Sequence, residues 1–160
     1  MIIRDIQPEF LQMMQEYPIV TLLGPRQAGK TTLARTVFPY KPYINMESPK
    51  TRALAEADPE GLLSRYPEGA IIDEVQRVPH LLSYLQVIVD ERGENGLYVL
   101  TGSHQLDLQE KISQSLAGRT AILNLLPLSF SEISQKYAIN NENELLFRGF
   151  LPRVYEGNQQ

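Results

Sequence analysis

Apolar residues along the chain alternate between two patterns. Short runs rich in Ile, Val and Leu predict buried strands at residues 19–23, 42–45, 69–74, 97–102 and 120–126. Apolar residues three or four positions apart predict helices at residues 8–17, 31–38, 48–57, 58–66, 79–93 and 106–118. Strands that alternate with helices are typical of a parallel sheet with helices on both faces, so we expect an α/β fold.

Helix-breaking and capping residues agree with this pattern. Pro18 and Pro39 end the first two helices, because proline lacks the backbone donor that a helix needs. Ser48 and Asp58 each stand before a proline, the order expected of an N-cap and the first helical residue. Gly93 ends a further helix.

The pattern changes at Pro127. Beyond it the sequence predicts two short helical stretches, separated by the polar residues 140–144, and a loosely held C-terminus. We therefore divide the chain into an α/β core, residues 1–126, and a helical appendage, residues 127–160. This appendage is either a partial helical lid or the start of a truncated second domain.

Composition and charge restrict the class of protein. The 160 residues are 42% hydrophobic and 21% charged, as in folded globular domains. A net charge of −4 argues against DNA binding by this segment alone, although nucleic acid stays open as a partner through a local basic patch. The chain has no cysteine, which excludes disulfides and thiolate chemistry. No apolar run approaches the ~20 residues of a membrane span, so we expect a cytoplasmic protein without membrane association.

The segment GPRQAGKTT, residues 24–32, predicts a phosphate-binding loop. It follows a strand and opens a helix, which aims backbone N–H groups and the positive helix end at one anion. Gly24 and Gly29 permit backbone shapes and close approaches that a Cβ would block. We expect Lys30 to neutralise phosphate oxygens and Thr31 to ligate Mg²⁺. The predicted nucleotide-binding residues are Gly24, Pro25, Arg26, Gln27, Ala28, Gly29, Lys30, Thr31 and Thr32. Arg26 and Thr32 also have ordinary explanations, as a solvated loop arginine and a structural threonine.

An acidic pair supplies the second half of the predicted site. Asp73 and Glu74 end the apolar segment AIIDE, at the carboxyl edge where parallel sheets hold ligands. We expect Asp73 to face the Mg²⁺ and Glu74 to orient and polarise the attacking water. By itself such a pair is better explained by a strand that ends in solvated acids; it is the phosphate-binding loop about forty residues earlier, with another strand between, that favours the functional interpretation.

Several segments in this order resemble the AAA+ ATPases: GPRQAGKTT, YINMESPKTR, AIIDEVQRVP, LTGS, and SLAGR followed by LLPLSFSEI. The chain is most similar to prokaryotic AAA-domain proteins whose ATPase core is normally followed by a C-terminal domain of unknown function. The resemblance covers nearly all of residues 1–150 and implies that this chain holds the ATPase core only. It implies a P-loop NTPase three-layer sandwich with a parallel five-stranded sheet of order 5-1-4-3-2, ATP and Mg²⁺ as ligands, and ATP hydrolysis.

The resemblance also implies polar residues that sense the γ-phosphate. Ser103, and with less support Thr101, stands at the end of a strand expected beside the loop, and a turn cap explains Ser103 equally well. Asn45 matches a position that often restrains the catalytic glutamate, although a turn asparagine is equally ordinary. We expect His104 to be an exposed loop histidine.

Arginines complete the sites of related ATPases. Arg119 follows SLAG, where family members often project an arginine finger into a neighbouring subunit; this implies a homo-oligomer. The alternative is an arginine that interacts with a helix C-terminus. Arg77 either serves similarly or binds an acidic neighbour. Arg148 and Arg153 are candidates by position for a lid arginine.

Three functions remain open at this point. The first is an Mg²⁺-dependent ATPase core that couples nucleotide state to an unknown protein partner or to an appended domain. The second is a nucleotide-gated binding or regulatory module with negligible turnover. The third is a small-molecule phosphotransferase. Two features argue against it: Glu74 suits the activation of water, and the tail offers no arginine-rich lid that would exclude water around a second substrate.

Overall fold

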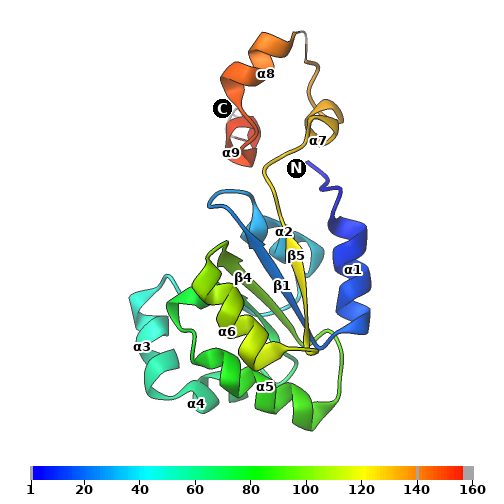
Figure 1. Ribbon diagram of the computed structural model, residues 1–160. Coiled ribbons are helices and arrows are strands. Elements are labelled where there is room, and N and C mark those ends of the chain that lie inside the picture. The colour runs from blue at the N-terminus through cyan, green and yellow to red at the C-terminus, as the bar shows by residue number, and fades with distance from the viewer. Residues whose placement is uncertain (1, 140, 157–160) are drawn as a thin grey trace.

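The computed structural model of the chain describes residues 2–139 and 141–156. It contains one parallel sheet, with strand order β2-β3-β4-β1-β5 (Figure 1). The strands are β1 (Ile19–Gly24), β2 (Tyr43–Asn45), β3 (Ala70–Asp73), β4 (Tyr98–Ser103) and β5 (Thr120–Asn124). This is the predicted order 5-1-4-3-2 read from the other edge, so the prediction of fold class is confirmed.

Helices cover both faces of the sheet, which gives three layers (Figure 1). The helices are α1 (Gln7–Glu16) and α2 (Lys30–Val37) on one face, and α3 (Pro49–Ala57), α4 (Pro59–Ser64), α5 (Leu81–Arg92) and α6 (Leu106–Leu116) on the other. Successive residues of β1 face opposite layers: Val20 and Leu22 pack with α1 and α2, and Ile19 and Leu23 pack with the other helices. The core therefore lies on both sides of the sheet.

The predicted helix caps are present. The Ser48 side chain accepts from the backbone N–H of Thr51, and Asp58 accepts from that of Gly61. Gly93 ends α5 with a φ of 62°. A short 3₁₀ helix, η1 (Val75–Arg77), follows β3 directly and was not expected from the apolar pattern.

The appendage corrects one prediction. It holds three short helices, α7 (Phe130–Ser134), α8 (Glu142–Arg148) and α9 (Pro152–Glu156), where two stretches were predicted. Part of the predicted polar separator belongs to a helix, because residues 142–144 form the first turn of α8. The Asn141 side chain caps this helix by accepting from the N–H of Glu144 at 2.7 Å. The loose C-terminus was predicted mainly for residues 157–160, which lie outside the described part of the chain.

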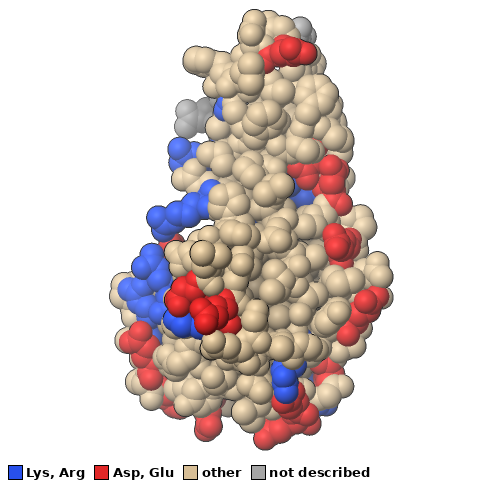
Figure 2. Space-filling model, in the orientation of Figure 1, with Lys and Arg blue, Asp and Glu red and all other residues tan. Residues whose placement is uncertain are grey.

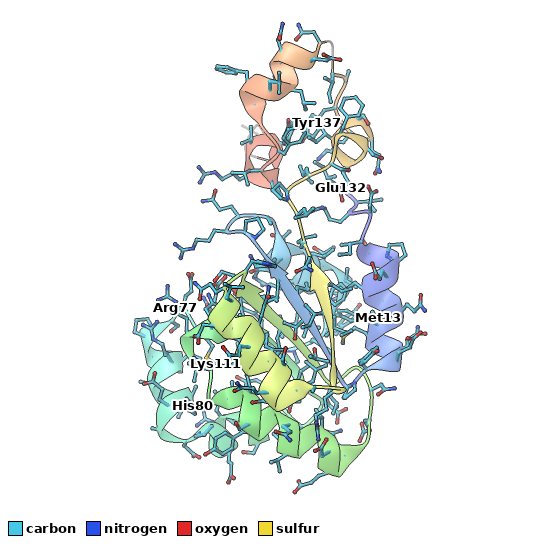
Figure 3. The ribbon with its side chains drawn as sticks, viewed as in Figure 1. Met13, Arg77, His80, Lys111, Glu132 and Tyr137 are labelled. Carbon is cyan, nitrogen blue, oxygen red and sulfur yellow. The ribbon has the colours of Figure 1, made fainter. Side chains whose placement is uncertain are left out.

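The appendage has a small apolar cluster of its own. Leu128, Ile133 and Tyr155 are buried in it, together with Ile2 from the N-terminal segment. Figure 3 shows Tyr137 and Glu132 in this upper part of the molecule, at a distance from Met13 on α1. The N-terminal segment thus joins the appendage before the chain enters α1. The boundary at residues 126 and 127 stays a prediction.

Among the described helices, none is both long and apolar enough to cross a lipid bilayer.

Candidate nucleotide-binding site

The loop between β1 and α2 lies at the carboxyl end of the sheet, directly before α2 (Figure 1). Its two glycines meet different constraints. Gly29 has a φ of 92°, in the left-handed region that other residues rarely adopt. A Cβ on Gly24 would lie 2.1 Å from the carbonyl oxygen of Leu125, so a neighbouring segment excludes a side chain there. The loop therefore combines a tight backbone turn with a helix N-terminus, the arrangement that holds an anion.

Lys30 is the first residue of α2 and is buried, with 5% of its surface exposed. Its Nζ donates to the carbonyl oxygens of Gly24 at 3.0 Å and Pro25 at 2.8 Å. Burial lowers the pKa of Lys30, and the carboxylates of Glu74 and Asp73 oppose this effect. Its hydrogen-bond partners are neutral carbonyl groups, which orient the ammonium group without cancelling its charge.

Asp73 lies at the end of β3 and is buried, with 6% of its surface exposed. Three hydroxyl groups donate to its carboxylate. Thr31 Oγ1 donates to Oδ1 at 2.7 Å, Tyr43 donates to Oδ2 at 2.7 Å, and Thr101 also donates to Oδ1. The structure thus brings the two predicted metal residues, Thr31 and Asp73, into direct contact across 42 positions of sequence.

Tyr43 was missed by the sequence analysis, which took it as an apolar residue of a short strand. Burial and the hydrogen bond to Asp73 raise the pKa of Tyr43, so its hydroxyl stays protonated at neutral pH. The Arg35 guanidinium lies 4.6 Å from its ring centroid. The signal that was available is the spacing: Tyr43 stands two residues before Asn45, which pairs with Asp73, so Tyr43 and Asn45 share a face of the strand.

Glu74 adopts a left-handed backbone conformation, with a φ of 59°. Such a conformation costs a non-glycine residue about 1–2 kcal/mol and often marks a functional position. Its backbone N–H donates to Thr101 Oγ1 at 3.1 Å, and its carboxylate accepts from Gln76 Nε2. Glu74 also borders a hollow of about 280 Å³ together with Lys30 and Thr31. The carboxylate therefore lies at the loop, beside the predicted metal residues.

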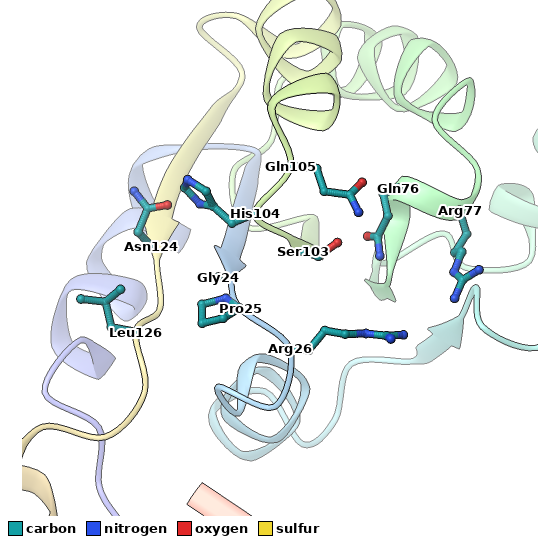
Figure 4. Close-up of a pocket in the computed structure, with 10 residues that line it drawn as sticks. All are labelled: Gly24, Pro25, Arg26, Gln76, Arg77, Ser103, His104, Gln105, Asn124 and Leu126. Atoms are coloured by element: carbon teal, nitrogen blue, oxygen red, sulfur yellow. The ribbon is translucent and has the colours of Figure 1, made fainter. Parts of the chain in front are cut away.

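Ser103 is the last residue of β4 and pairs in register with Gly24, the first residue of the loop motif. It faces a cleft of about 1050 Å³ at the carboxyl edge of the sheet (Figure 4). The loop residues Pro25 and Arg26 form one side of this cleft, and Gln76 forms another. The predicted position of β4 beside the loop is thus found, and Ser103 borders the cleft next to the loop. Its contact with a γ-phosphate stays a prediction.

The remaining loop residues divide between these two spaces. Gln27, with a φ of 65°, and the exposed Thr32 line the 280 Å³ hollow. Ala28 is buried, and its carbonyl group accepts from Arg4. His104 is exposed at the cleft, where its ring contacts Gln109 Nε2.

The carboxylate of Glu47 lies near two arginines that line the cleft. Its carboxylate lies 3.6 Å from Arg26 and 4.0 Å from Arg77, and all three side chains are well exposed. Figure 2 shows basic side chains along this margin, at the level where Figure 3 places Arg77. Asn45 Oδ1 accepts from the backbone N–H of Glu47 at 2.8 Å, a local turn contact. The glutamate at the site is instead held by Gln76, which the sequence analysis did not single out.

Arg119 is not brought to the loop. It directly precedes β5 at the amino edge of the sheet, where its carbonyl accepts from the N–H of Ile19 at 3.2 Å. Its guanidinium donates twice to Asp90, at 2.6 and 2.7 Å, and once to Ala117 O. The hydrogen bond from Arg119 lowers the pKa of Asp90. Within one chain, Arg119 is therefore an ion-pair partner of α5.

The two appendage arginines differ in position. Arg148 pairs with Glu144 at 2.8 Å on the same helix. Arg153 instead lines the 280 Å³ hollow, as do Lys30 and Thr31. Only the second of these candidates thus borders the phosphate loop in the described structure.

A further hollow of about 220 Å³ continues from this space on the other side of the loop. The two hollows share Gly29, Thr32 and Pro152. Apolar residues from three segments line the smaller one: the N-terminal segment, α2 and the appendage contribute Ile2, Ile3, Leu33, Leu128 and Pro152. The site thus has a charged part at the loop and a more apolar part beside it.

Known proteins resemble this chain in sequence or in fold. The uncharacterized protein Rv2008c of Mycobacterium tuberculosis is 35% identical over 150 residues, which are 93% of this chain and 33% of that protein. The chain therefore spans about a third of the length of this curated relative.

Two solved structures resemble the fold at low sequence identity. The Walker-type ATPase PABY2304 of Pyrococcus abyssi has a TM-score of 0.60 and 18% identity, over 100% of this chain and 69% of that one. AMPPCP-bound DnaA of Aquifex aeolicus has a TM-score of 0.61 and 14% identity, over 96% of this chain and 57% of that one. At these identities the likeness concerns the fold alone.

The AAA domain family matches residues 16–134, a segment that runs from the end of α1 through β5 to α7. This segment contains the loop, both acidic residues of the site and all strands of the sheet. Because the match spans more than half of the sequence, the chain belongs to the AAA domain family of P-loop ATPases.

Proposed function

We propose that the chain binds ATP with Mg²⁺ and hydrolyses it. The observation that carries this proposal is the contact of Thr31 with Asp73, beside a buried Lys30 and with Glu74 on the same hollow. P-loop ATPases use these groups in phosphoryl transfer: the hydroxyl group and the carboxylate hold Mg²⁺, and the ammonium group at the helix N-terminus binds the phosphates.

The residues present fit a magnesium ion. Mg²⁺ in nucleotide sites is held by one or two carboxylates together with substrate phosphates, and keeps several waters. Asp73 and Thr31 offer the corresponding oxygen atoms at the loop. The bound ion would neutralise phosphate charge, while Tyr43 and Thr101 hold the Asp73 carboxylate in place.

The two hollows suggest how a nucleotide lies in the site. The phosphates occupy the loop and the 280 Å³ hollow, which Arg153 and Lys30 both line. The base occupies the more apolar 220 Å³ hollow between the N-terminal segment, α2 and the appendage. Gln7 borders this space and offers an amide to the base edge. Preference for adenine is part of the proposal.

Glu74 is proposed to orient the attacking water, with Ser103 as a polar contact near the γ-phosphate. Carboxylates in such a position contribute about 10²–10⁴-fold to rate. We expect Glu74→Gln to bind MgATP as tightly as the wild-type chain and to lose turnover by at least about a hundredfold. Release of inorganic phosphate and nucleotide affinity are measured on the same preparation.

The matched control is Glu56→Gln, which removes one exposed carboxylate from α3 without touching the site. Its turnover should equal that of the wild-type chain. Equal hydrolysis by wild type and Glu74→Gln would exclude the role assigned to Glu74.

A second candidate is a nucleotide-gated binding module with negligible turnover. Two observations favour it: Gln76 holds the Glu74 carboxylate, and Arg119 is paired with Asp90 at the other edge of the sheet. Single-turnover hydrolysis across protein concentration distinguishes the two functions. A steep rise with concentration implies an arginine supplied by a neighbouring copy, whereas no hydrolysis at any concentration favours the module.

The longer relative suggests what the domain acts on. Because the chain spans about a third of that protein, we propose that nucleotide state is transmitted to an appended domain or protein partner. A homo-oligomer, a nucleic-acid partner and a cytoplasmic location remain predictions.

A further inference from the structure

Arg4 is a buried charge to which the proposed function gives no role, although it borders the 220 Å³ hollow. It stands just before α1 and has 7% of its surface exposed. Its guanidinium reaches three segments: Nη1 donates to Ala28 O at 2.7 Å, Nη2 donates to Leu126 O at 2.6 Å, and Nε donates to Glu132 Oε1 at 3.0 Å. One side chain thus contacts the phosphate loop, the end of the core and the first helix of the appendage.

The contact with Ala28 acts on the loop backbone. The carbonyl group of Ala28 and the N–H group of Gly29 belong to one planar trans peptide, so they point in opposite directions. When Arg4 holds the carbonyl oxygen, the N–H of Gly29 faces away from Arg4. Gly29 borders the 280 Å³ hollow, and it also borders the 220 Å³ hollow together with Arg4. Arg4 therefore acts on a peptide group that lies at the proposed site.

The contact with Glu132 acts on the appendage. This carboxylate is buried, with 4% of its surface exposed, and also accepts from the backbone N–H groups of Asp5 and Ser129, each at 2.8 Å. Burial alone would raise the pKa of Glu132, but the hydrogen bonds from Ser129, Asp5 and Arg4 outweigh it and lower this pKa. Glu132 therefore stays charged, and it fixes the N-terminus of α7 to Arg4.

We propose that Arg4 is a positioning residue that couples the phosphate loop to α7. This inference rests on the proposed nucleotide binding. A nucleotide that orders the loop also fixes the Ala28 carbonyl, and through Arg4 and Glu132 it restrains α7. Because coupling between two sites is reciprocal, a displaced α7 weakens nucleotide binding by the same factor.

The first test measures the affinity of the 160-residue chain for the β,γ-methylene analogue of ATP with Mg²⁺. In Arg4→Lys the charge remains, but one nitrogen replaces the guanidinium that reaches three separated acceptors. We expect the affinity to fall about tenfold, as for loss of a charge-assisted hydrogen bond. In turnover assays KM should rise by a similar factor while kcat changes little.

Ser129→Ala is the matched control. It removes the side-chain cap of α7, which accepts from the N–H of Glu132 at 3.1 Å, but leaves the backbone group that contacts Glu132. It should lower the stability of α7 but leave the affinity within about twofold, because the Arg4–Glu132 contact remains and still holds the start of α7 beside Arg4. An equal loss in both variants would mean that general loosening of the appendage explains the effect, and would overturn the proposal.

A second measurement has a wild-type arm that does not depend on the folding of any variant. In the wild-type chain, the analogue should slow hydrogen exchange at the loop amides and at the α7 amides of Glu132 and Ile133 together. In Arg4→Lys the loop should still be protected and α7 should not. Protection of the wild-type loop without protection of α7 would overturn the proposal. A wild-type chain that does not bind the analogue would instead reject the proposed function, so the two failures are distinct.

Discussion

The charged residues at the amino ends of the strands (the amino edge) and at their carboxyl ends (the carboxyl edge) have different kinds of partner. At the amino edge, Arg119 and Asp90 neutralise each other in a partly exposed ion pair with two hydrogen bonds. At the carboxyl edge, Lys30 and Asp73 are buried, and their hydrogen-bond partners are neutral carbonyl and hydroxyl groups.

At the amino edge the charges are already paired with each other, whereas at the carboxyl edge the charges can still pair with a ligand. An ion pair already satisfies both charges, and in solvent it adds little to stability. A charge that is hydrogen-bonded to neutral groups still attracts a ligand of opposite sign. In the free protein this arrangement costs free energy, because the charge is buried. The carboxyl edge therefore offers a positive group to phosphate and a negative group to a cation.

The largest effect is expected from removing the positive group of that edge. Lys30→Ala should weaken MgATP affinity by about a hundredfold or more, because charge-assisted hydrogen bonds to phosphate are lost. The fold should persist, because Gly24 O also accepts from the backbone N–H of His104 at 3.3 Å and Pro25 is exposed. Calorimetric titration and thermal unfolding measure the two quantities. Lys50→Ala, on the exposed face of α3, is the control and should bind normally; a similar loss there would contradict the contrast between the edges.

An intermediate effect is expected from the hydroxyl group that orients Asp73. Tyr43→Phe keeps the ring against Arg35 and removes the donor to Oδ2. Loss of such an outer contact typically lowers metal affinity by about tenfold, so a higher Mg²⁺ concentration should be needed for half-maximal nucleotide binding. The free energy of unfolding should fall by about 1 kcal/mol.

Tyr40→Phe provides the control, because its side chain is 98% exposed. Its Mg²⁺ dependence should match that of the wild-type chain. If Tyr43→Phe titrates identically as well, the neutral donors of the carboxyl edge do not prepare Asp73 for a cation.

The smallest effect on a single chain is expected at the amino edge. Arg119→Ala should leave nucleotide affinity unchanged and shift the thermal midpoint very little, because its pair with Asp90 is exposed. Asp90→Ala breaks the same pair while keeping the arginine, and should behave alike in both assays. A turnover loss in Arg119→Ala alone, confined to high protein concentration, would support a finger supplied in trans. A loss of affinity at low concentration would contradict the separation of the two edges.

The sequence predicted the features that depend on local order along the chain. The alternation of strands and helices predicted the layers, and the family resemblance implied the strand order that the structure shows. The contact of Thr31 with Asp73 followed from the rule that ligands lie at the carboxyl edge of parallel strands.

Features that depend on distant pairs were not predicted. Arg4 and Glu132 are separated by 128 positions. Glu132 stands in the segment LLPLSFSEI and forms a capping box with Ser129, but neither local sequence indicates the other residue as a partner. Tyr43 and Gln76 were overlooked because a tyrosine in an apolar strand and a glutamine in a turn have many ordinary explanations. Their importance arises from the one carboxylate that each contacts, Asp73 and Glu74 respectively. The third appendage helix was missed because the second predicted stretch is divided into α8 and α9 at Gly149, which ends α8 with a φ of 74°.

The position of β1 in the sheet has a consequence for synthesis. Ile19 lies near the start of the chain, yet its partners in the sheet are Tyr98 of β4 and Thr120 of β5. Contacts between such distant segments form late, because loop closure must precede the gain from pairing. While the chain emerges from the ribosome, β1 can contact α1 and α2 but has no strand partner until β4 and β5 have been made. On the proposed function, ATP therefore stabilises only a core that is already nearly complete.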